Sequence, residues 1–314
     1  MGLHVIVGAG SIGSGTAQRL VGAGHRVKLV SRSGRGPRLD GIELVAADAS
    51  DPAALGRVVA GADVIYNCAN PAYHQWETDW PPIANALLAT AEATGAGLVT
   101  MGNLYGYGPV DGPMTEHTPL AATSRKGRVR ARMWRDMLAA HEAGRVRVTE
   151  ARASDFFGPS IVDNGLFART VMPRLLAGRS VMHIAALDAP HTWTYAPDVT
   201  AALATLGTDD RAWDRPWHVP SNEPKTVREM VTGLAEAAGV PAPRISAIPR
   251  FAMRTLGLAM PMAREFEEVR YQHDRPFVMS SEDFTATFGV KPTPLDDALR
   301  ETVAWWRTRL AEAA

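Results

Sequence analysis

The first segment able to do chemistry is a glycine-rich turn, Gly8-Ala9-Gly10-Ser11-Ile12-Gly13, which directly follows a short apolar run. Between a strand and a helix, the first glycine allows a tight turn, the second admits a pyrophosphate, and the third lets helix pack on strand. The helix N-terminus then presents N–H groups and a positive dipole end to phosphate. The turn predicts a dinucleotide site at Gly8, Gly10, Ser11, Ile12 and Gly13; an ordinary strand–helix turn is the alternative.

The residues after the second predicted strand indicate which dinucleotide would bind. NAD sites usually carry an acid there, which bonds the ribose 2′-hydroxyl. This chain instead reads Val30-Ser31-Arg32-Ser33-Gly34-Arg35. Arg32 can bond a 2′-phosphate in a bidentate way, with Ser31 and Arg35 beside it. The sequence therefore favours NADP over NAD. Asp48, after the third strand, either meets the adenine or is a surface turn residue.

Polar and aromatic residues follow three later strands, where a parallel sheet presents its ligand-binding edge. We expect the cofactor to reach Ala69 and Asn70, directly after the fourth strand. The candidate substrate residues are Tyr73, Trp76, Asn103, Tyr105, Asp155 and Phe156. His74 and Asp155 are also candidates for proton exchange, although each is singly more typical of packing or capping.

The pattern of apolar residues predicts the elements that position these side chains. Strands are expected at His4–Val7, Arg26–Val30, Ile42–Ala46, Ala62–Asn67, Leu98–Met101 and Val146–Ala151. Helices are expected between them at Ser14–Gly22, Pro52–Ala60, Asp79–Thr94 and Arg125–Ala143. Such alternation predicts an α/β fold, a doubly wound parallel sheet of the Rossmann type.

The second half of the sequence alternates less regularly and contains more proline. Its expected helices are Leu166–Leu176, Val227–Ala238 and Pro294–Leu310, with strands at Trp217–Val219 and Ile245–Ile248. We assign residues 1–155 to the dinucleotide-binding domain. Residues 156–314 form mainly a smaller C-terminal substrate lobe, with some segments returning to the sheet.

Composition excludes several classes of function. Lys+Arg and Asp+Glu both total 33, so no excess charge favours nucleic acid or a membrane surface. The single Cys68 excludes an internal disulfide, and no apolar run has the length of a signal peptide or a membrane span. We therefore expect a cytoplasmic protein, complete from its first residue. The nine histidines include no HExxH or comparable cluster, so no metal is predicted.

Across nearly its whole length the chain resembles the extended branch of the short-chain dehydrogenase/reductase superfamily, the NAD(P)-dependent epimerase/dehydratase group. The resemblance rests on Asp63–Ala69, Asn85, Tyr105-Gly106, Arg152–Pro159, Thr192–Val199, Phe288–Pro292 and the terminal Trp305-Trp306-Arg307. The arginine-to-Gly-Pro segment is the most specific of these. The resemblance implies a dinucleotide-dependent enzyme with a small-molecule substrate.

The sequence departs from this family at its chemistry. The family's Tyr-x-x-x-Lys motif is absent, and Lys126-Gly127-Arg128-Val129-Arg130 falls on its place. In one register Lys126 replaces the tyrosine and Arg130 the lysine; in the other, Lys126 remains the lysine that holds the nicotinamide ribose. Thr100 stands near the place of the family's serine. Lys126 can donate a proton only if burial beside Arg130 favours its neutral form; a solvated helix face is the alternative.

These observations lead to one main expectation and two alternatives. The main expectation is an NADP(H)-dependent oxidoreductase that transfers hydride to or from a carbonyl or alcohol carbon of a polar small molecule. The first alternative is a redox-neutral epimerase or dehydratase with a retained cofactor, and the second is a non-catalytic dinucleotide sensor. The resemblance also implies a homodimer through helices 80–94 and 126–143, with apolar contacts from Ala84, Leu87, Leu88 and Ala91.

Overall fold

The computed structural model describes residues 1–163, 165–248 and 261–313, which fold into two compact units. Unit 1 comprises Met1–Gly108, Thr118–Ala153 and Val199–Val219. Unit 2 comprises Pro109–His117, Ser154–Asp198 and Pro220–Ala314. No helix in the described part of the chain is long and apolar enough to cross a membrane.

A seven-stranded parallel sheet forms the centre of unit 1, which confirms the predicted doubly wound fold. Its strands are β1 (Leu3–Val7), β2 (Arg26–Ser31), β3 (Ile42–Ala46), β4 (Val64–Asn67), β5 (Gly97–Asn103), β6 (Val148–Ala153) and β10 (Pro216–His218). Their spatial order is β10-β6-β5-β4-β1-β2-β3, and every neighbouring pair is parallel. The order of connection reverses between β1 and β4, so the ligand crevice of such a sheet lies beyond the carboxyl ends of these two strands.

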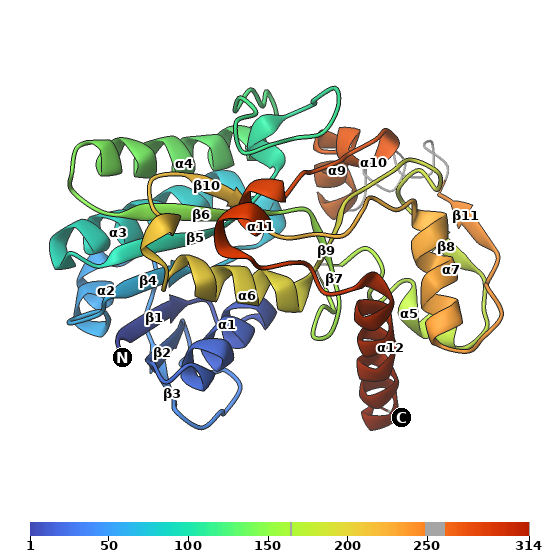
Figure 1. Cartoon of the computed structure of the whole chain (residues 1–314), viewed down its shortest axis with the longest axis horizontal. Helices are drawn as coiled ribbons and strands as arrows, with labels where there is room; N and C mark the ends of the chain where they lie inside the picture. The colour runs from blue at the N-terminus through green and yellow to red at the C-terminus, as the bar shows by residue number, and fades with distance from the viewer. Residues whose placement is uncertain (164, 249–260, 314) are drawn as a thin grey trace. The chain divides into compact units, whose positions relative to one another are not determined.

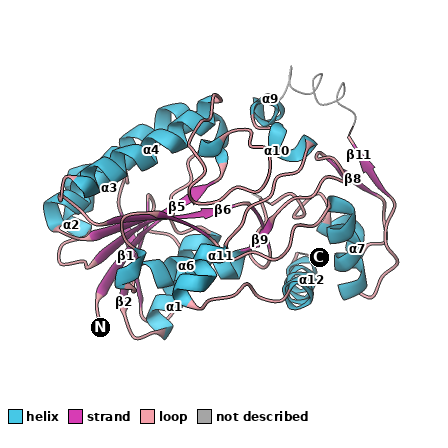
Figure 2. Cartoon of the chain, turned by 45° about the horizontal axis from the view of Figure 1, so that its top comes forward, coloured by secondary structure: helices cyan, strands magenta, loops and turns pink. Residues whose placement is uncertain are grey.

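Helices cover both faces of this sheet (Figures 1 and 2). One face carries α2 (Pro52–Val58), α3 (Trp76–Thr94) and α4 (Arg125–Glu142); the other carries α1 (Ser11–Gly22) and α6 (Ala196–Leu206). Apolar side chains of α2, α3 and α4 form one core with those of β1, β4 and β5. All five residues of β1 are buried, because a central parallel strand is covered on both faces. Short 3-10 helices are η1 (Tyr73–Gln75), η2 (Tyr105–Tyr107) and η3 (Asp210–Ala212).

Helix α3 begins three residues before the predicted start at Asp79. Pro81 and Pro82 lie inside it and cannot donate backbone hydrogen bonds, so the local sequence indicates a later start. The buried side chains of Trp76 and Trp80 hold the first turn by tertiary packing. The helix ends at Thr94, as predicted, and Gly95 follows it in the left-handed conformation that serves as a C-cap.

One expectation about oligomerisation is partly wrong. Leu87 and Ala91, expected at a dimer contact, belong to the core of unit 1 and are almost fully buried within the single chain. Ala84 and Leu88 remain partly exposed on the same helix.

Unit 2 is built from small sheets and helices. Its strands form two parallel pairs, β7 (Asp155–Phe157) with β9 (Trp193–Tyr195), and β8 (Val181–His183) with β11 (Ile245–Ala247). Its helices are α5 (Met172–Leu176), α7 (Val227–Ala237), α9 (Pro261–Glu268), α10 (Tyr271–Asp274), α11 (Glu282–Phe288) and α12 (Leu295–Glu312). An apolar core joins α5, α7 and α12.

Helix α5 is shorter than the predicted helix Leu166–Leu176. The residues before Met172 form turns, and only Met172–Leu176 is helical. Pro173 accounts for part of the difference, because proline lacks the N–H that a continuous helix would bond to Arg169.

Candidate active site

The glycine turn joins β1 to α1, and its three glycines do different things. A Cβ on Gly13 would lie 1.9 Å from the carbonyl oxygen of Gly8, and one on Gly8, whose φ is +115°, would lie 2.4 Å from the carbonyl oxygen of Cys68. These two glycines are therefore required by packing. A Cβ on Gly10 would meet no protein atom within 4 Å. The space above Gly10 fits the approach of a pyrophosphate, and the exposed Ser11 and half-buried Ile12 begin the helix beside it.

The loop after β2 exposes Arg32 and Arg35 to solvent. The hydroxyl of Ser31 donates to the carbonyl of Arg35 at 2.7 Å, so this serine shapes the loop. Asp48 is exposed and accepts the backbone N–H and the hydroxyl of Ser50; these bonds, aided by the charge of Arg32, lower the pKa of its carboxyl. These hydrogen bonds are those of a surface turn, and the contact of Asp48 with the adenine stays a prediction.

The loop after β4 begins beside Gly8 and continues to Tyr73 and Trp76. The N–H of Ala69 donates to Oδ1 of Asn67 at 3.3 Å, and Asn70 is exposed. Both residues lie beyond the carboxyl end of β4, where the cofactor is expected.

Two tyrosines and a lysine come together at the ends of β4 and β5. The hydroxyls of Tyr73 and Tyr105 lie 3.2 Å apart, and Nζ of Lys126 lies 4.6 Å from the centre of the Tyr73 ring. Lys126 is buried in the first turn of α4, so it is not part of a solvated helix face. The arrangement brings two exchangeable phenol protons beside a buried amine.

Local backbone structure holds this group together. Ser124 caps α4 by accepting the N–H of Gly127 at 3.1 Å. A Cβ on Gly127 would lie 2.6 Å from the carbonyl oxygen of Tyr105, so only glycine lets α4 approach η2 this closely. Asn103 accepts the N–H of Tyr105 at 3.1 Å and thereby fixes the turn that carries the tyrosine.

Arg130 lies one turn further along α4, between two indole rings. Its Cζ lies 4.6 Å from the ring centre of Trp76 and 4.3 Å from that of Trp80, and its Nη1 donates to the carbonyl of Met101. Burial lowers the pKa of this guanidinium to about 10, which leaves it charged at neutral pH. Its buried Nε has no hydrogen-bond partner among the described residues.

Two other predicted catalytic residues, Thr100 and His74, have surroundings different from those of this group. Thr100 is buried in the middle of β5 and donates to the sulfur of Met137 at 3.4 Å, so its hydroxyl serves packing under α4. His74 is exposed in η1.

A buried ionic network near the end of β6 is one that sequence reasoning missed. Arg152 donates to Glu150 at 2.6 Å and to the hydroxyl of Tyr107 at 2.8 Å, and that hydroxyl lies 2.7 Å from Nε2 of His218. Burial alone would lower the pKa of Arg152, but the carboxylate and the phenol outweigh it and raise the pKa. In the sequence, the only sign of this network is that Glu150 and Arg152 alternate with small residues in a buried strand.

Asp155 opens β7 in unit 2, where it meets histidines from distant parts of the sequence. Its Oδ2 lies 2.9 Å from Nε2 of His191 and 3.8 Å from Nδ1 of His273. Burial would raise the pKa of Asp155, but these histidines and His183 outweigh burial and lower it. Burial lowers the pKa of both His183 and His273 to about 4, so these rings are neutral near pH 7. His191 and His273 lie 36 and 118 residues after Asp155, which hid this cluster from a search for local motifs.

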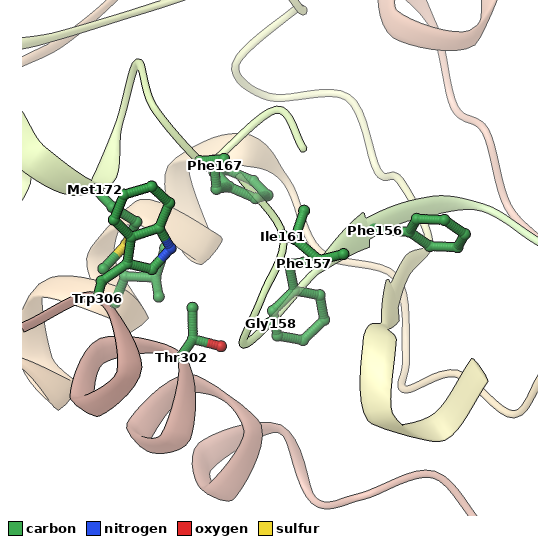
Figure 3. A pocket seen from close by; sticks show the side chains of 10 residues that line it. Phe156, Phe157, Gly158, Ile161, Phe167, Met172, Thr302 and Trp306 are labelled. Carbon is green, nitrogen blue, oxygen red and sulfur yellow. The ribbon is translucent and has the colours of Figure 1, made fainter. Parts of the chain in front are cut away.

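Phe156, the next residue of β7, lines a small apolar cavity (Figure 3). The other walls come from Phe157, Phe167, Met172 and Trp306, among others. The volume that a water-sized molecule can occupy is only about 10 Å³, which is too small for a substrate. This void is therefore no substrate pocket, and the substrate contact of the half-buried Phe156 stays a prediction.

Residues 4–218 match the model of the NAD dependent epimerase/dehydratase family. The protein belongs to this family, which confirms the resemblance inferred from the sequence. No protein of curated function matches the sequence.

Solved structures share the fold along nearly the whole chain. A dTDP-glucose 4,6-dehydratase from Bacillus anthracis in complex with NAD superposes with a TM-score of 0.80, at 19% identity over 98% of this chain and 97% of that one. A UDP-glucose 4-epimerase from Thermotoga maritima with UDP-glucose superposes with a TM-score of 0.79, at 17% identity over 98% of this chain and 99% of that one. A dTDP-glucose 4,6-dehydratase from Streptomyces venezuelae with NAD bound gives 0.78, at 21% identity over 99% and 98%.

Proposed function

We propose that this protein is a redox-neutral epimerase or dehydratase that retains a dinucleotide and acts on a nucleotide-activated sugar. The observation that carries the proposal is the group of Tyr73, Tyr105 and Lys126 at the carboxyl ends of β4 and β5, in the same unit as the open glycine turn. The structural relatives support the choice of chemistry, because they are dehydratases and epimerases with NAD or a nucleotide sugar bound. Net oxidation or reduction, the main expectation from sequence, has no comparable support.

Each part of the site has a role in this reaction. The turn from Gly8 to Gly13 holds the pyrophosphate on the N-terminus of α1. The bound dinucleotide supplies reversible hydride transfer. The hydroxyls of Tyr73 and Tyr105, 3.2 Å apart, exchange a proton with the substrate oxygen.

Lys126 assists this proton exchange but does not itself donate the proton. Its ammonium lies over the face of the Tyr73 ring, where positive charge stabilises the phenolate that forms when the proton leaves. We also propose that the ammonium of Lys126 contacts the nicotinamide ribose. Arg130, between its two indoles, would hold the substrate or the ribose through its unpartnered Nε.

We propose NADP as the preferred dinucleotide. The exposed Arg32 follows β2 in a loop, Ser31–Arg35, that contains no acidic residue, and such an arginine matches a 2′-phosphate. Changing Arg32 to Ala should weaken NADP binding by roughly tenfold to a hundredfold, since a hydrogen bond to a charged group contributes about 1.5–3 kcal/mol. NAD affinity should hardly change. Arg57→Ala, which removes an exposed arginine of α2, is the matched control, and calorimetry measures all three proteins. Equal wild-type affinities for both dinucleotides would contradict the preference.

The reaction itself is tested with dTDP-glucose and UDP-glucose as substrates. We expect nuclear magnetic resonance to detect a converted sugar with no net change in NAD(P)H absorbance. Changing Tyr73 or Tyr105 to Phe should lower kcat by about 10²–10⁴, because each removes an exchangeable proton. Tyr66→Phe is the control, since this hydroxyl bonds His4 elsewhere in unit 1.

Other results of these assays would favour the net oxidoreductase or the non-catalytic sensor. Stoichiometric consumption of NADPH with a carbonyl substrate would restore the net oxidoreductase. Tight dinucleotide binding without conversion of any sugar in a broad panel would favour the sensor. Wild-type rates in both tyrosine variants would remove these phenols from the mechanism.

A further inference from the structure

We infer that Asp155, His191 and His273 form a binding site for a divalent transition-metal cation in unit 2. One atom from each residue is available as a ligand, and the three atoms lie within 4.8 Å of one another. Two imidazole nitrogens and one carboxylate oxygen are a ligand set typical of zinc and of non-haem iron sites that keep open positions. The inference does not depend on the dinucleotide reaction.

The distances fit a cation after a small adjustment. With metal–ligand bonds of about 2.0–2.2 Å, tetrahedral geometry separates two ligand atoms by roughly 3.3 Å. The carboxylate oxygen Oδ2 lies 2.9 Å from one imidazole nitrogen and 3.8 Å from the other, which brackets this value. All three ligand atoms lie within 4.8 Å of one another, so the two imidazole nitrogens need to approach each other by at most about 1.5 Å to complete the geometry.

The hydrogen bond on the far side of His191 orients it as a metal ligand. Its Nδ1 lies 3.1 Å from the backbone carbonyl of Gln272, which can only accept, so the proton sits on Nδ1. In the neutral ring, the lone pair of Nε2 then faces Oδ2 of Asp155, with the hydroxyl of Ser154 also 3.3 Å away. Two lone pairs facing each other at 2.9 Å repel unless a positive charge lies between them. A backbone carbonyl on the outer nitrogen is also the usual support of a metal-bound histidine.

Unpartnered buried atoms point to the same place. Oδ2 of Asp155, Nδ1 of His273 and Nε2 of His183 are buried and have no hydrogen-bond partner within the described residues. Such atoms are costly unless something satisfies them, and a cation would satisfy the first two. The side chain of Asp155 is 23% exposed, which leaves a route for an ion to enter.

His183 has a different role from the three ligands. Its Nδ1 accepts the N–H of Ala185 at 3.1 Å, so its proton lies on Nε2, which faces no partner in the described structure. This N–H suits a water or hydroxide held at the open position of the cation, not the cation itself.

The experiment uses the full chain, stripped of metal with a chelator and titrated with Zn²⁺ by calorimetry and with Co²⁺ by visible absorption. We expect one Zn²⁺ per chain and the strong d–d bands of four-coordinate or five-coordinate Co²⁺. Asp155→Asn and His273→Gln should each weaken Zn²⁺ binding by roughly a hundredfold or more, since loss of outer-shell partners alone costs 10–100-fold. His117→Ala, an exposed histidine of the same unit, is the matched control.

Two results would overturn the site: absence of Zn²⁺ binding to the wild type, or equal affinity in the wild type and both ligand variants. Circular dichroism of each metal-free variant establishes that it is folded. The wild-type cobalt spectrum and a rise in its Tm with Zn²⁺ test the site without any variant, because a ligand that binds the native state stabilises it. Octahedral, weakly absorbing Co²⁺ in the wild type would also count against it.

Discussion

Changing Gly10 to Ala should separate dinucleotide binding from folding. Gly10 has φ −79° and ψ −175°, which alanine adopts without strain, and the added Cβ would meet no protein atom within 4 Å. Lower entropy of the unfolded chain favours the variant by about 0.4–1 kcal/mol, whereas alanine is a poorer N-cap than glycine by a similar amount. The free energy of unfolding should therefore stay within about 1 kcal/mol of the wild type.

Dinucleotide affinity should respond much more strongly. The methyl group would occupy the space above the turn and displace the pyrophosphate from the N-terminus of α1. Loss of two hydrogen bonds to a charged group costs about 3–6 kcal/mol, which corresponds to roughly 10²–10⁴ in Kd. Calorimetric titration with NADP and NAD measures the affinity, and urea unfolding measures the stability.

Two other glycines of the same helix provide matched comparisons. A Cβ on Gly22 also meets nothing within 4 Å, but it lies at the far end of α1, so Gly22→Ala should bind the dinucleotide normally. Gly13→Ala would place its Cβ 1.9 Å from the carbonyl of Gly8 and should unfold or distort unit 1. If Gly10→Ala binds within a few-fold of the wild type, the reasoning that assigns the open space to the dinucleotide is wrong.

Three further predictions follow from buried charges and exposed helices. Burial, with help from His25, lowers the pKa of His4 from 6.5 to about 4, so between these pH values the unfolded chain binds a proton that the folded chain does not. The free energy of unfolding should therefore fall as the pH drops from 6.5 to 4, by at most on the order of 3 kcal/mol. Urea unfolding at several pH values measures this loss, which should be smaller in His4→Gln. Arg130→Lys should lower stability by roughly 1–3 kcal/mol, because an ammonium cannot stack on Trp76 and Trp80 as a planar guanidinium does; an unchanged Tm in thermal unfolding would contradict this. We also predict a homodimer through the outer faces of α3 and α4, and a monomer mass in light scattering at all concentrations would exclude it.

The alternation of short apolar runs with amphipathic segments determined the fold of unit 1. Buried parallel strands such as Leu3–Val7 must be apolar on both faces, so their sequence is distinctive. The glycine turn was equally readable, because only glycine tolerates the contacts at Gly8 and Gly13. Family membership followed from motifs that extend along the chain.

Tertiary structure alone decided the functional groups. The sequence does not show that Tyr73, Tyr105 and Lys126 meet, because Tyr73 follows β4 whereas the other two follow β5, and their approach depends on how α4 packs against η2. The cluster at Asp155 depends still more on folding, since His273 is far away in the sequence and no periodic pattern relates the two. Local patterns encode elements, whereas side chains that meet across a fold are set by packing, which has no sequence period.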